Sequence, residues 1–216
     1  MTPNTPTIPL GNIEEDGRSE RKDAAANRKR ILETADALFA EKGVENVCMA
    51  EIAQAARVGK GTLYRRFANK AELCLALMDT QMIDFQNGML AEFRKMTANS
   101  VPKMSQLEFF MDGLVHFTDA HAPLLTEVQS EGLLQAGRST ALPHFWQYMT
   151  VHGLFQAAID AGELPAGLDT EYLADALLAS LKVDIFRFQR EVRGFSLERI
   201  SEGLRVLITS LRYCID

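Results

Sequence analysis

Residues 56–67, ARVGKGTLYRRF, form the centre of the stretch that decides the fold, which runs from Asn27 to Leu77. Leu63 and Phe67 are four residues apart, so both fall on one face of a helix while the basic side chains around them fall on or beside the opposite face. The pattern predicts three short helices, the third of them basic and turned outward. A longer fourth helix is expected to follow without a clear break.

The charge of the chain is unevenly distributed. Residues 21–70 carry eleven lysines and arginines against six acidic residues, a net charge of +5, whereas the whole chain carries −6 and the remainder therefore −11. This segregation indicates a module that binds a polyanion, attached to an acidic module that solubilises or senses. A solvated helix face that happens to be basic would give the same count, and charge alone does not separate the two interpretations.

Length and composition exclude several classes of protein. A chain of 216 residues, 47% of them hydrophobic, can bury a core and is too apolar to be disordered. Cys48, Cys74 and Cys214 are far apart and form no CxxC pair, so we expect free thiols in a reducing cytoplasm. Residues 1–22 do not resemble a signal peptide, and no apolar run is long enough to span a membrane. We therefore expect a cytoplasmic protein with a disordered tail over residues 1–22 and no membrane partner.

Three helices are expected in the first part of the chain. The first carries an apolar stripe at helical spacing and ends at Gly43. The second covers about residues 49–56, and the third covers about residues 60–67 after a turn. Two helices joined by so short a turn form a helix-turn-helix, whose second helix enters the major groove of DNA. Gly59 and Gly61 let the backbone approach a duplex and leave N–H groups free for a phosphate.

These residues also carry a family resemblance. The strings ILETADALFAEKG (residues 31–43) and IAQAARVGKGTLYRRFANKAEL (residues 52–73) are similar to the N-terminal domain of the TetR family of transcriptional regulators. The resemblance covers about a quarter of the chain, and many positions agree at fixed spacing. It implies a DNA-binding head followed by a variable helical regulatory domain.

Two positions depart from the family pattern. Members usually have Thr or Ser at the start of the second helix, where the hydroxyl caps the helix and reaches a phosphate, whereas this chain has Val47 and Cys48. Cys48 is either a passive replacement for serine or a thiol sensor at a helix N-terminus. The turn usually reads Ala-Gly-Val-Ser, whereas residues 56–59 read Ala-Arg-Val-Gly, which removes a serine cap and adds a cation.

Side-chain chemistry and the resemblance together suggest roles in DNA binding. Lysine and arginine donate to guanine, and the threonine methyl group meets thymine. The candidates for base contacts are therefore Lys60, Thr62 and Arg65. Tyrosine and the lysine that opens the fourth helix contact phosphates in proteins that this chain resembles, and other cations and helix N–H groups suit the same partner. The candidates for phosphate contacts are Arg57, Gly61, Tyr64, Arg66 and Lys70; a merely solvated arginine explains Arg66 equally well.

The rest of the chain is expected to be helical throughout. A fourth helix is predicted over residues 69–96, and further helices over residues 103–119, 123–135, 143–161, 170–192 and 197–213, between clusters of Gly, Pro, Asn and Ser. The expected fold class is all-α with about nine helices. We expect a three-helix helix-turn-helix DNA-binding domain over residues 23–69 and a helical bundle for ligand binding and dimerisation over residues 70–216.

Two apolar groups suggest functions for this second region. Aromatic and methionine side chains of the middle helices, with a glutamine and a histidine as polar contacts, could line an apolar cavity, although a filled core explains them as well. The candidates for ligand contacts are Phe85, Met89, Phe93, Phe110, Met111, Phe117, Gln129, Trp146, Met149, His152 and Phe155. In proteins that this chain resembles, the last two helices form a four-helix interface with a second copy. The candidates for dimerisation are Leu177, Leu181, Phe188, Leu204, Leu207, Ile208 and Leu211, with a purely intrachain core as the alternative.

Catalytic and metal-binding patterns are absent from the sequence. We expect no helical zinc site at the four histidines, His116, His121, His144 and His152, and no GxSxG or phosphate-binding glycine loop is present. We therefore expect no enzyme activity, no cofactor and no metal. The sequence predicts a homodimeric repressor that binds a palindromic operator in double-stranded DNA and is released by a small, largely apolar effector. The alternatives are a ligand-independent architectural DNA-binding protein and a helical enzyme. No group of residues in the sequence supports the enzyme.

Overall fold

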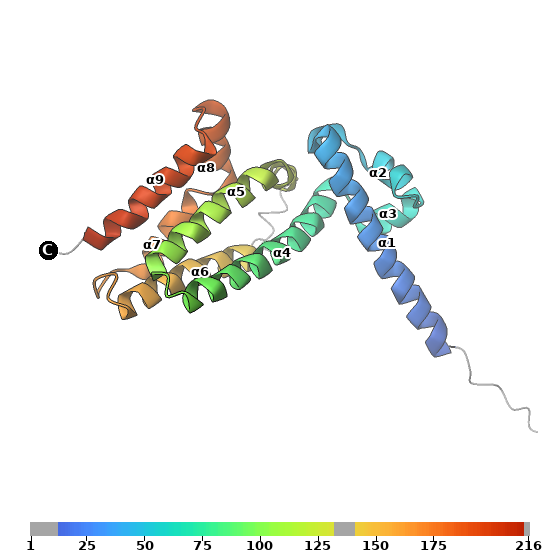
Figure 1. Cartoon of the computed structure of the whole chain (residues 1–216). Helices are drawn as coiled ribbons and strands as arrows, with labels where there is room; N and C mark the ends of the chain where they lie inside the picture. The colour runs from blue at the N-terminus through green and yellow to red at the C-terminus, as the bar shows by residue number, and fades with distance from the viewer. Residues whose placement is uncertain (1–12, 132–140, 214–216) are drawn as a thin grey trace, which may run out of the picture. The chain divides into compact units, whose positions relative to one another are not determined.

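The computed structural model describes residues 13–131 and 141–213, and these ranges contain nine α-helices and no β-strand (Figure 1). The first four helices are α1 (Ile13–Lys42), α2 (Met49–Ala55), α3 (Lys60–Arg66) and α4 (Lys70–Ala98). The others are α5 (Lys103–Ser130), α6 (Ala141–Asp160), α7 (Thr170–Ala179), α8 (Val183–Arg187) and α9 (Leu197–Ser210). Two turns of 3-10 helix at Val44–Asn46 and Leu211–Tyr213 and a π-helical turn at Phe188–Val192 complete the described chain. The all-α fold class is confirmed.

The chain divides into two compact units, residues 1–70 and 71–216. In the first unit, α2 packs against both α1 and α3. The apolar stripe of α1 is buried as its spacing predicts, and it meets apolar side chains of the two shorter helices. This core comprises Ile31, Leu32, Ala35, Phe39, Val44, Val47, Met49, Ile52, Ala53, Ala56, Leu63 and Phe67.

The end of α1 is fixed by backbone geometry and by an ion pair. Gly43 follows the helix with a φ of 82°, a conformation that glycine adopts without steric cost. The Nζ of Lys42 donates to the carboxylate of Glu51 on α2, and this hydrogen bond raises the pKa of Lys42. The contact joins the first two helices at the edge of the unit.

Helix α1 begins earlier than the sequence suggested. Residues 13–22, which we expected to belong to a disordered tail, continue α1 toward the N-terminus, and residues 1–12 of that tail lie outside the described residues. The segment IEEDGRSERK contains six glutamate, arginine and lysine residues with high helix propensity and no proline, so nothing in it stops the helix.

In the second unit α5 is the central helix, because it contacts α6, α8 and α9, while α6 also contacts α7 (Figure 1). Its buried face meets apolar side chains from all of these helices in one continuous core. Aromatic rings join α4 to this core, since the centroid of the Phe85 ring lies 4.7 Å from that of Phe117 and 6.2 Å from that of Trp146. No helix among the described residues is both long and apolar enough to cross a membrane.

Two breaks between helices differ from those expected. The predicted helices at 103–119 and 123–135 are one helix, α5, which passes through Pro123. Pro123 is exposed, so the hydrogen bond that proline cannot donate is missing on the solvent side, while Leu124 and Val128 continue the buried face. The single helix predicted at 170–192 is instead split into α7, α8 and the π-helical turn.

Candidate nucleic-acid interface and ligand site

The turn between α2 and α3 is closed by two backbone hydrogen bonds. The N–H of Arg57 donates to the carbonyl of Gln54 at 3.1 Å, and the N–H of Val58 donates to the carbonyl of Ala53 at 3.0 Å. This pair of bonds is the Schellman ending of a helix, which places one residue in the left-handed conformation. Arg57 is that residue, with a φ of 53°. The reversal allows α3 to begin at Lys60, directly after its N-cap Gly59.

Helix α3 has one buried face and one outward face. Leu63 is fully buried and Phe67, the C-cap, is nearly so, and these two side chains anchor the helix in the first unit. Arg28 on α1 places its guanidinium 5.9 Å from the centre of the Phe67 ring, a contact that sequence reasoning missed. Five predicted DNA contacts are exposed on the outward side of this anchor, namely Arg57, Lys60, Gly61, Tyr64 and Arg65.

The other three predicted DNA contacts are half-buried. They are Thr62, Arg66 and Lys70. The Nζ of Lys70 donates to the carbonyl of Val44 at 2.9 Å, so this lysine already ties the start of α4 to the turn after α1. An ammonium group has three donors, so this bond does not by itself exclude a phosphate. The Nε of Arg66 is buried and has no hydrogen-bond partner among the described residues.

The exposed cations around α3 are not neutralised by the protein. Arg57, Lys60 and Arg65 form no ion pair with any residue that the structure describes, while nearby acidic groups are engaged elsewhere. Glu51 pairs with Lys42, and Glu33 pairs with Lys29. Unpaired positive charge on one exposed face, beside a helix N-terminus, is suited to the phosphates of a nucleic acid.

The start of α2 reflects the departure from the family pattern. Cys48 is its N-cap and is exposed, but its side chain makes no capping hydrogen bond. A thiol is a weak hydrogen-bonding group, which accounts for the missing cap. Cys74 is buried and forms no disulfide with the described residues, whereas Cys214 lies outside them.

The predicted ligand contacts are divided between the core of the second unit and its surface. Phe110, Met111 and Phe155 are buried in the core of the second unit, and Phe85, Met89, Phe93 and Trp146 pack against that core. Phe117 stacks on His121, and His152 stacks on Tyr148. Met149 is exposed, and the exposed Gln129 donates to Asp184 at 2.7 Å. Most of these side chains therefore have packing partners within the chain, and their role in ligand binding stays a prediction.

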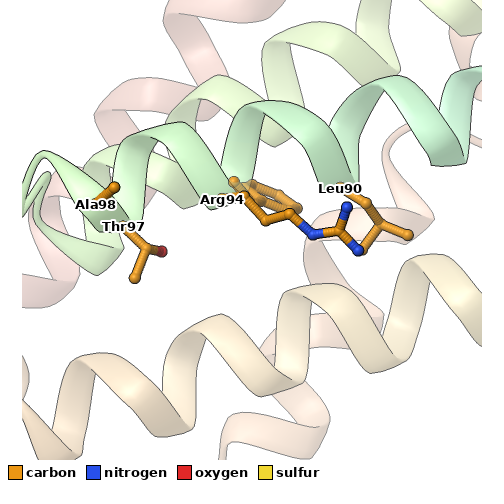
Figure 2. A pocket seen from close by; sticks show the side chains of 5 residues that line it. Leu90, Arg94, Thr97 and Ala98 are labelled. Carbon is orange, nitrogen blue, oxygen red and sulfur yellow. The ribbon is translucent and has the colours of Figure 1, made fainter.

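An open groove of about 480 Å³ runs along one side of α4. It is lined by Leu90, Phe93, Arg94, Thr97 and Ala98. Figure 2 shows Leu90, Arg94 and Thr97 along the same side of α4. Only Phe93 among the five lining residues belongs to the predicted ligand contacts. The others are spaced three, four and seven residues apart, and this helical spacing could have identified them in the sequence.

The predicted dimerisation residues fall into two groups. Leu177, Leu204 and Ile208 are buried in the core of the second unit, so within one chain they cannot be reached by a second copy. Leu181 and Leu211 are half-buried, whereas Phe188 and Leu207 are 52% and 56% exposed. Further apolar side chains are exposed nearby in sequence, namely Ile185, Val192 and Val206.

Comparisons with known proteins identify relatives over most of the chain. The family model described as "Bacterial regulatory proteins, tetR family" matches residues 31–77, which span the helix-turn-helix and the start of α4. An HTH-type transcriptional regulator of Staphylococcus aureus is 32% identical over 178 residues, covering 82% of this chain and 90% of the relative.

Solved structures share the fold at lower sequence identity. A putative transcriptional regulator from Saccharomonospora viridis, in complex with choline, has a TM-score of 0.68 at 19% identity. The alignment covers 85% of this chain and 96% of that regulator. Thermus thermophilus FadR, a TetR-family repressor in complex with lauroyl-CoA, has a TM-score of 0.63 at 20% identity. The alignment covers 84% of this chain and 92% of FadR. The family model, the relative that aligns over most of the chain and the helix-turn-helix of the structure all indicate the same family. The chain belongs to the TetR family of transcriptional regulators.

Proposed function

We propose that the protein is a repressor that binds a palindromic operator as a homodimer and releases it when a small, largely apolar effector binds. The observation that carries this proposal is the outward face of α3, where Lys60, Tyr64 and Arg65 are exposed beside a buried anchor. A helix of this kind enters the major groove by its N-terminal end, and two copies must lie about 34 Å apart to reach successive grooves.

The roles on α3 follow from the chemistry of each group. Lys60 and Arg65 donate to guanine, and the methyl group of Thr62 contacts thymine. The Tyr64 hydroxyl, the Gly61 N–H and the cations of Arg66 and Lys70 contact phosphates, which fixes the helix in the groove without reading sequence. Binding therefore combines a salt-dependent, sequence-independent part with a smaller part that depends on sequence.

The effector site is assigned to the second unit. The groove along α4 offers Leu90 and Phe93 as apolar contacts and Arg94 and Thr97 as polar ones. Similar regulators have been crystallised with choline and with lauroyl-CoA, which supports a small-molecule effector without naming it. Helix α4 starts three residues after Phe67 and carries Phe93, so one helix connects the groove to the end of α3. A ligand that prefers a different separation of the two α3 helices weakens DNA binding by its differential affinity.

The direct test is DNA binding by the full chain at fixed salt concentration. Duplexes selected by the protein from a random pool are compared with scrambled duplexes of equal length. A repressor binds the selected duplex more tightly by about 10³-fold or more. A ratio near one would instead establish the alternative, a ligand-independent architectural protein.

Two substitutions separate base contacts from phosphate contacts. Lys60→Ala is expected to weaken binding to the selected duplex by about tenfold and to reduce the preference over the scrambled one, because the variant no longer donates to a base. Tyr64→Phe removes only a hydroxyl and is expected to weaken binding to both duplexes by the same factor. Tyr172→Phe, at an exposed tyrosine of α7, serves as a control and leaves both affinities unchanged. Equal losses on both duplexes for Lys60→Ala would remove Lys60 from the base contacts.

A further inference from the structure

Among the described residues, three helices end in the same backbone motif. At the end of α4, the N–H of Ser100 donates to the carbonyl of Thr97 and the N–H of Val101 donates to that of Met96. At the end of α6, the N–H groups of residues 162 and 163 donate in the same way to residues 159 and 158. Together with the end of α2, these are three Schellman endings, each with one residue at positive φ.

The residue at the positive-φ position differs among the three. It is Gly162 after α6, with a φ of 72°, but Ser100 after α4, with a φ of 54°, and Arg57 after α2, with a φ of 53°. Glycine adopts this conformation without a clash, whereas the Cβ of any other L-residue crowds a carbonyl oxygen. An arginine at this position therefore lowers the stability of the folded state relative to glycine.

Contacts within the protein do not compensate for this strain. The Arg57 side chain is exposed and forms no ion pair or hydrogen bond with the described residues. Its backbone N–H bond to Gln54 would be made equally well by glycine. Strain without an internal gain is typical of functional sites, and Arg57 differs from the equally strained Ser100 in its exposed cation beside α3. Arg57 also precedes Lys60 by three residues, next to the outward face of α3.

We propose that Arg57 contacts the sugar–phosphate backbone of DNA, and that the turn of this helix-turn-helix retains a strained arginine because DNA binding gains from it. The inference rests on the proposed function, since it requires α3 to lie against a duplex. A guanidinium donates to phosphate oxygens, and such a contact adds affinity without sequence preference. The turn thus exchanges folding stability for affinity at a single residue.

The test is Arg57→Gly in the full chain. In the absence of DNA, its melting temperature is expected to rise by about 2–4 °C, because the backbone strain is removed. Its affinity for the selected and the scrambled duplex is expected to fall by the same factor, on the order of three- to tenfold. The slope of log affinity against log salt is expected to decrease by about 0.9 for each phosphate that the variant no longer neutralises.

Two further variants separate the backbone effect from the charge effect. Ser100→Gly removes the same strain after α4, so it is expected to raise the melting temperature similarly and leave DNA binding unchanged. Arg57→Lys keeps the positive charge and the strained backbone, so it is expected to retain the wild-type salt slope and most of the affinity.

Four outcomes would overturn the inference. Wild-type affinity and salt slope in Arg57→Gly would refute the contact and leave the proposed function intact, as would loss on the selected duplex alone. A melting temperature that rises in Ser100→Gly but not in Arg57→Gly would refute the exchange of stability for affinity. A wild-type protein that binds no duplex of the pool would refute the proposed function, and this inference with it.

Discussion

Gly61 lies in the first turn of α3 on its exposed side, and a Cβ placed there would have no described atom within 4 Å. Glycine is less favourable than alanine inside a helix by up to about 1 kcal/mol. The folded chain on its own therefore gains nothing from glycine at this position. Glycine would instead favour DNA binding, because the missing side chain lets a phosphate reach the N–H groups of the helix N-terminus.

Replacing Gly61 with alanine is expected to separate stability from DNA binding. The free energy of unfolding should stay the same or rise by up to about 1 kcal/mol, since alanine favours the helix. Affinity for the selected duplex should fall by about tenfold, equivalent to about 1.4 kcal/mol, because the new methyl group meets the DNA. Urea denaturation and binding titrations measure the two effects.

The control for this experiment is Gly88→Ala in α4. Gly88 is also exposed and helical, and a Cβ there would likewise have no described atom within 4 Å. It is expected to show the gain in helix stability without the loss of DNA affinity. If Gly61→Ala and Gly88→Ala bind DNA equally well, the duplex does not approach α3 at Gly61.

Local spacing predicted which side of α3 is buried, but it could not predict two features of single residues. Leu63 and Phe67, four residues apart, define the anchored face and so leave Lys60 and Arg65 exposed. The bond from Lys70 to the carbonyl of Val44 joins residues 26 apart in sequence, and no local pattern indicates it. The positive φ of Arg57 was also unexpected, because arginine rarely adopts it.

At the scale of a helix, the start of α5 is stabilised by a distant side chain. Its N-cap is Pro102, which has no side-chain oxygen to accept from the first N–H groups. The carboxylate of Glu163 accepts instead, from the N–H of Lys103 at 2.7 Å and from that of Met104 at 2.9 Å. Glu163 directly follows Gly162, whose left-handed conformation ends α6 and turns the chain toward α5. The turn that ends α6 thus caps the start of α5.

Loss of this cap should destabilise the second unit. Glu163→Ala is expected to lower the free energy of unfolding by about 1–2 kcal/mol, because two N–H groups lose a charged acceptor. Glu163→Gln keeps one oxygen acceptor and a similar shape but loses the charge, so it should have a smaller effect. Urea denaturation of both variants measures the difference. Equal stability of Glu163→Ala and the wild type would show that water replaces the carboxylate at no cost.

The helix boundaries of the second unit show where prediction from sequence fails. Leu177 and Phe186 are buried in the same core, yet they are nine residues apart, about half a turn out of phase on a continuous helix. The break between α7 and α8 lets both side chains enter this core, and packing rather than local sequence sets it. The run ALLASLKVDIF contains no glycine or proline to mark this break, so one continuous helix was predicted.

At the scale of the whole molecule, the proposed repressor is a dimer of this chain. Only side chains that are exposed in the single chain can form the interface between the two copies. Burial of Leu177, Leu204 and Ile208 within one chain gives these residues an intrachain role. Phe188 and Leu207 remain available, with Ile185, Val192 and Val206 also exposed in the same part of the chain. Exposed apolar side chains of this size are typical of an interface between proteins when they form one patch. We therefore place the proposed dimer interface on α8, the π-helical turn and the outer face of α9.

The decisive substitution for this interface is Leu207→Arg. Leu207 is 56% exposed, so the change should alter the stability of the single chain by no more than about 0.5 kcal/mol. An arginine buried between two copies would have no partner, so the variant should sediment as a monomer at concentrations where the wild type is a dimer. Its affinity for a palindromic duplex should then fall by about 10²-fold or more, because one α3 engages only one half-site.

Ile83→Arg on α4, at the same 56% exposure, provides the matched control and should remain a dimer. A dimer in Leu207→Arg would exclude the outer face of α9 from the interface, and a wild-type monomer that still selects a palindrome would exclude the dimeric mechanism itself.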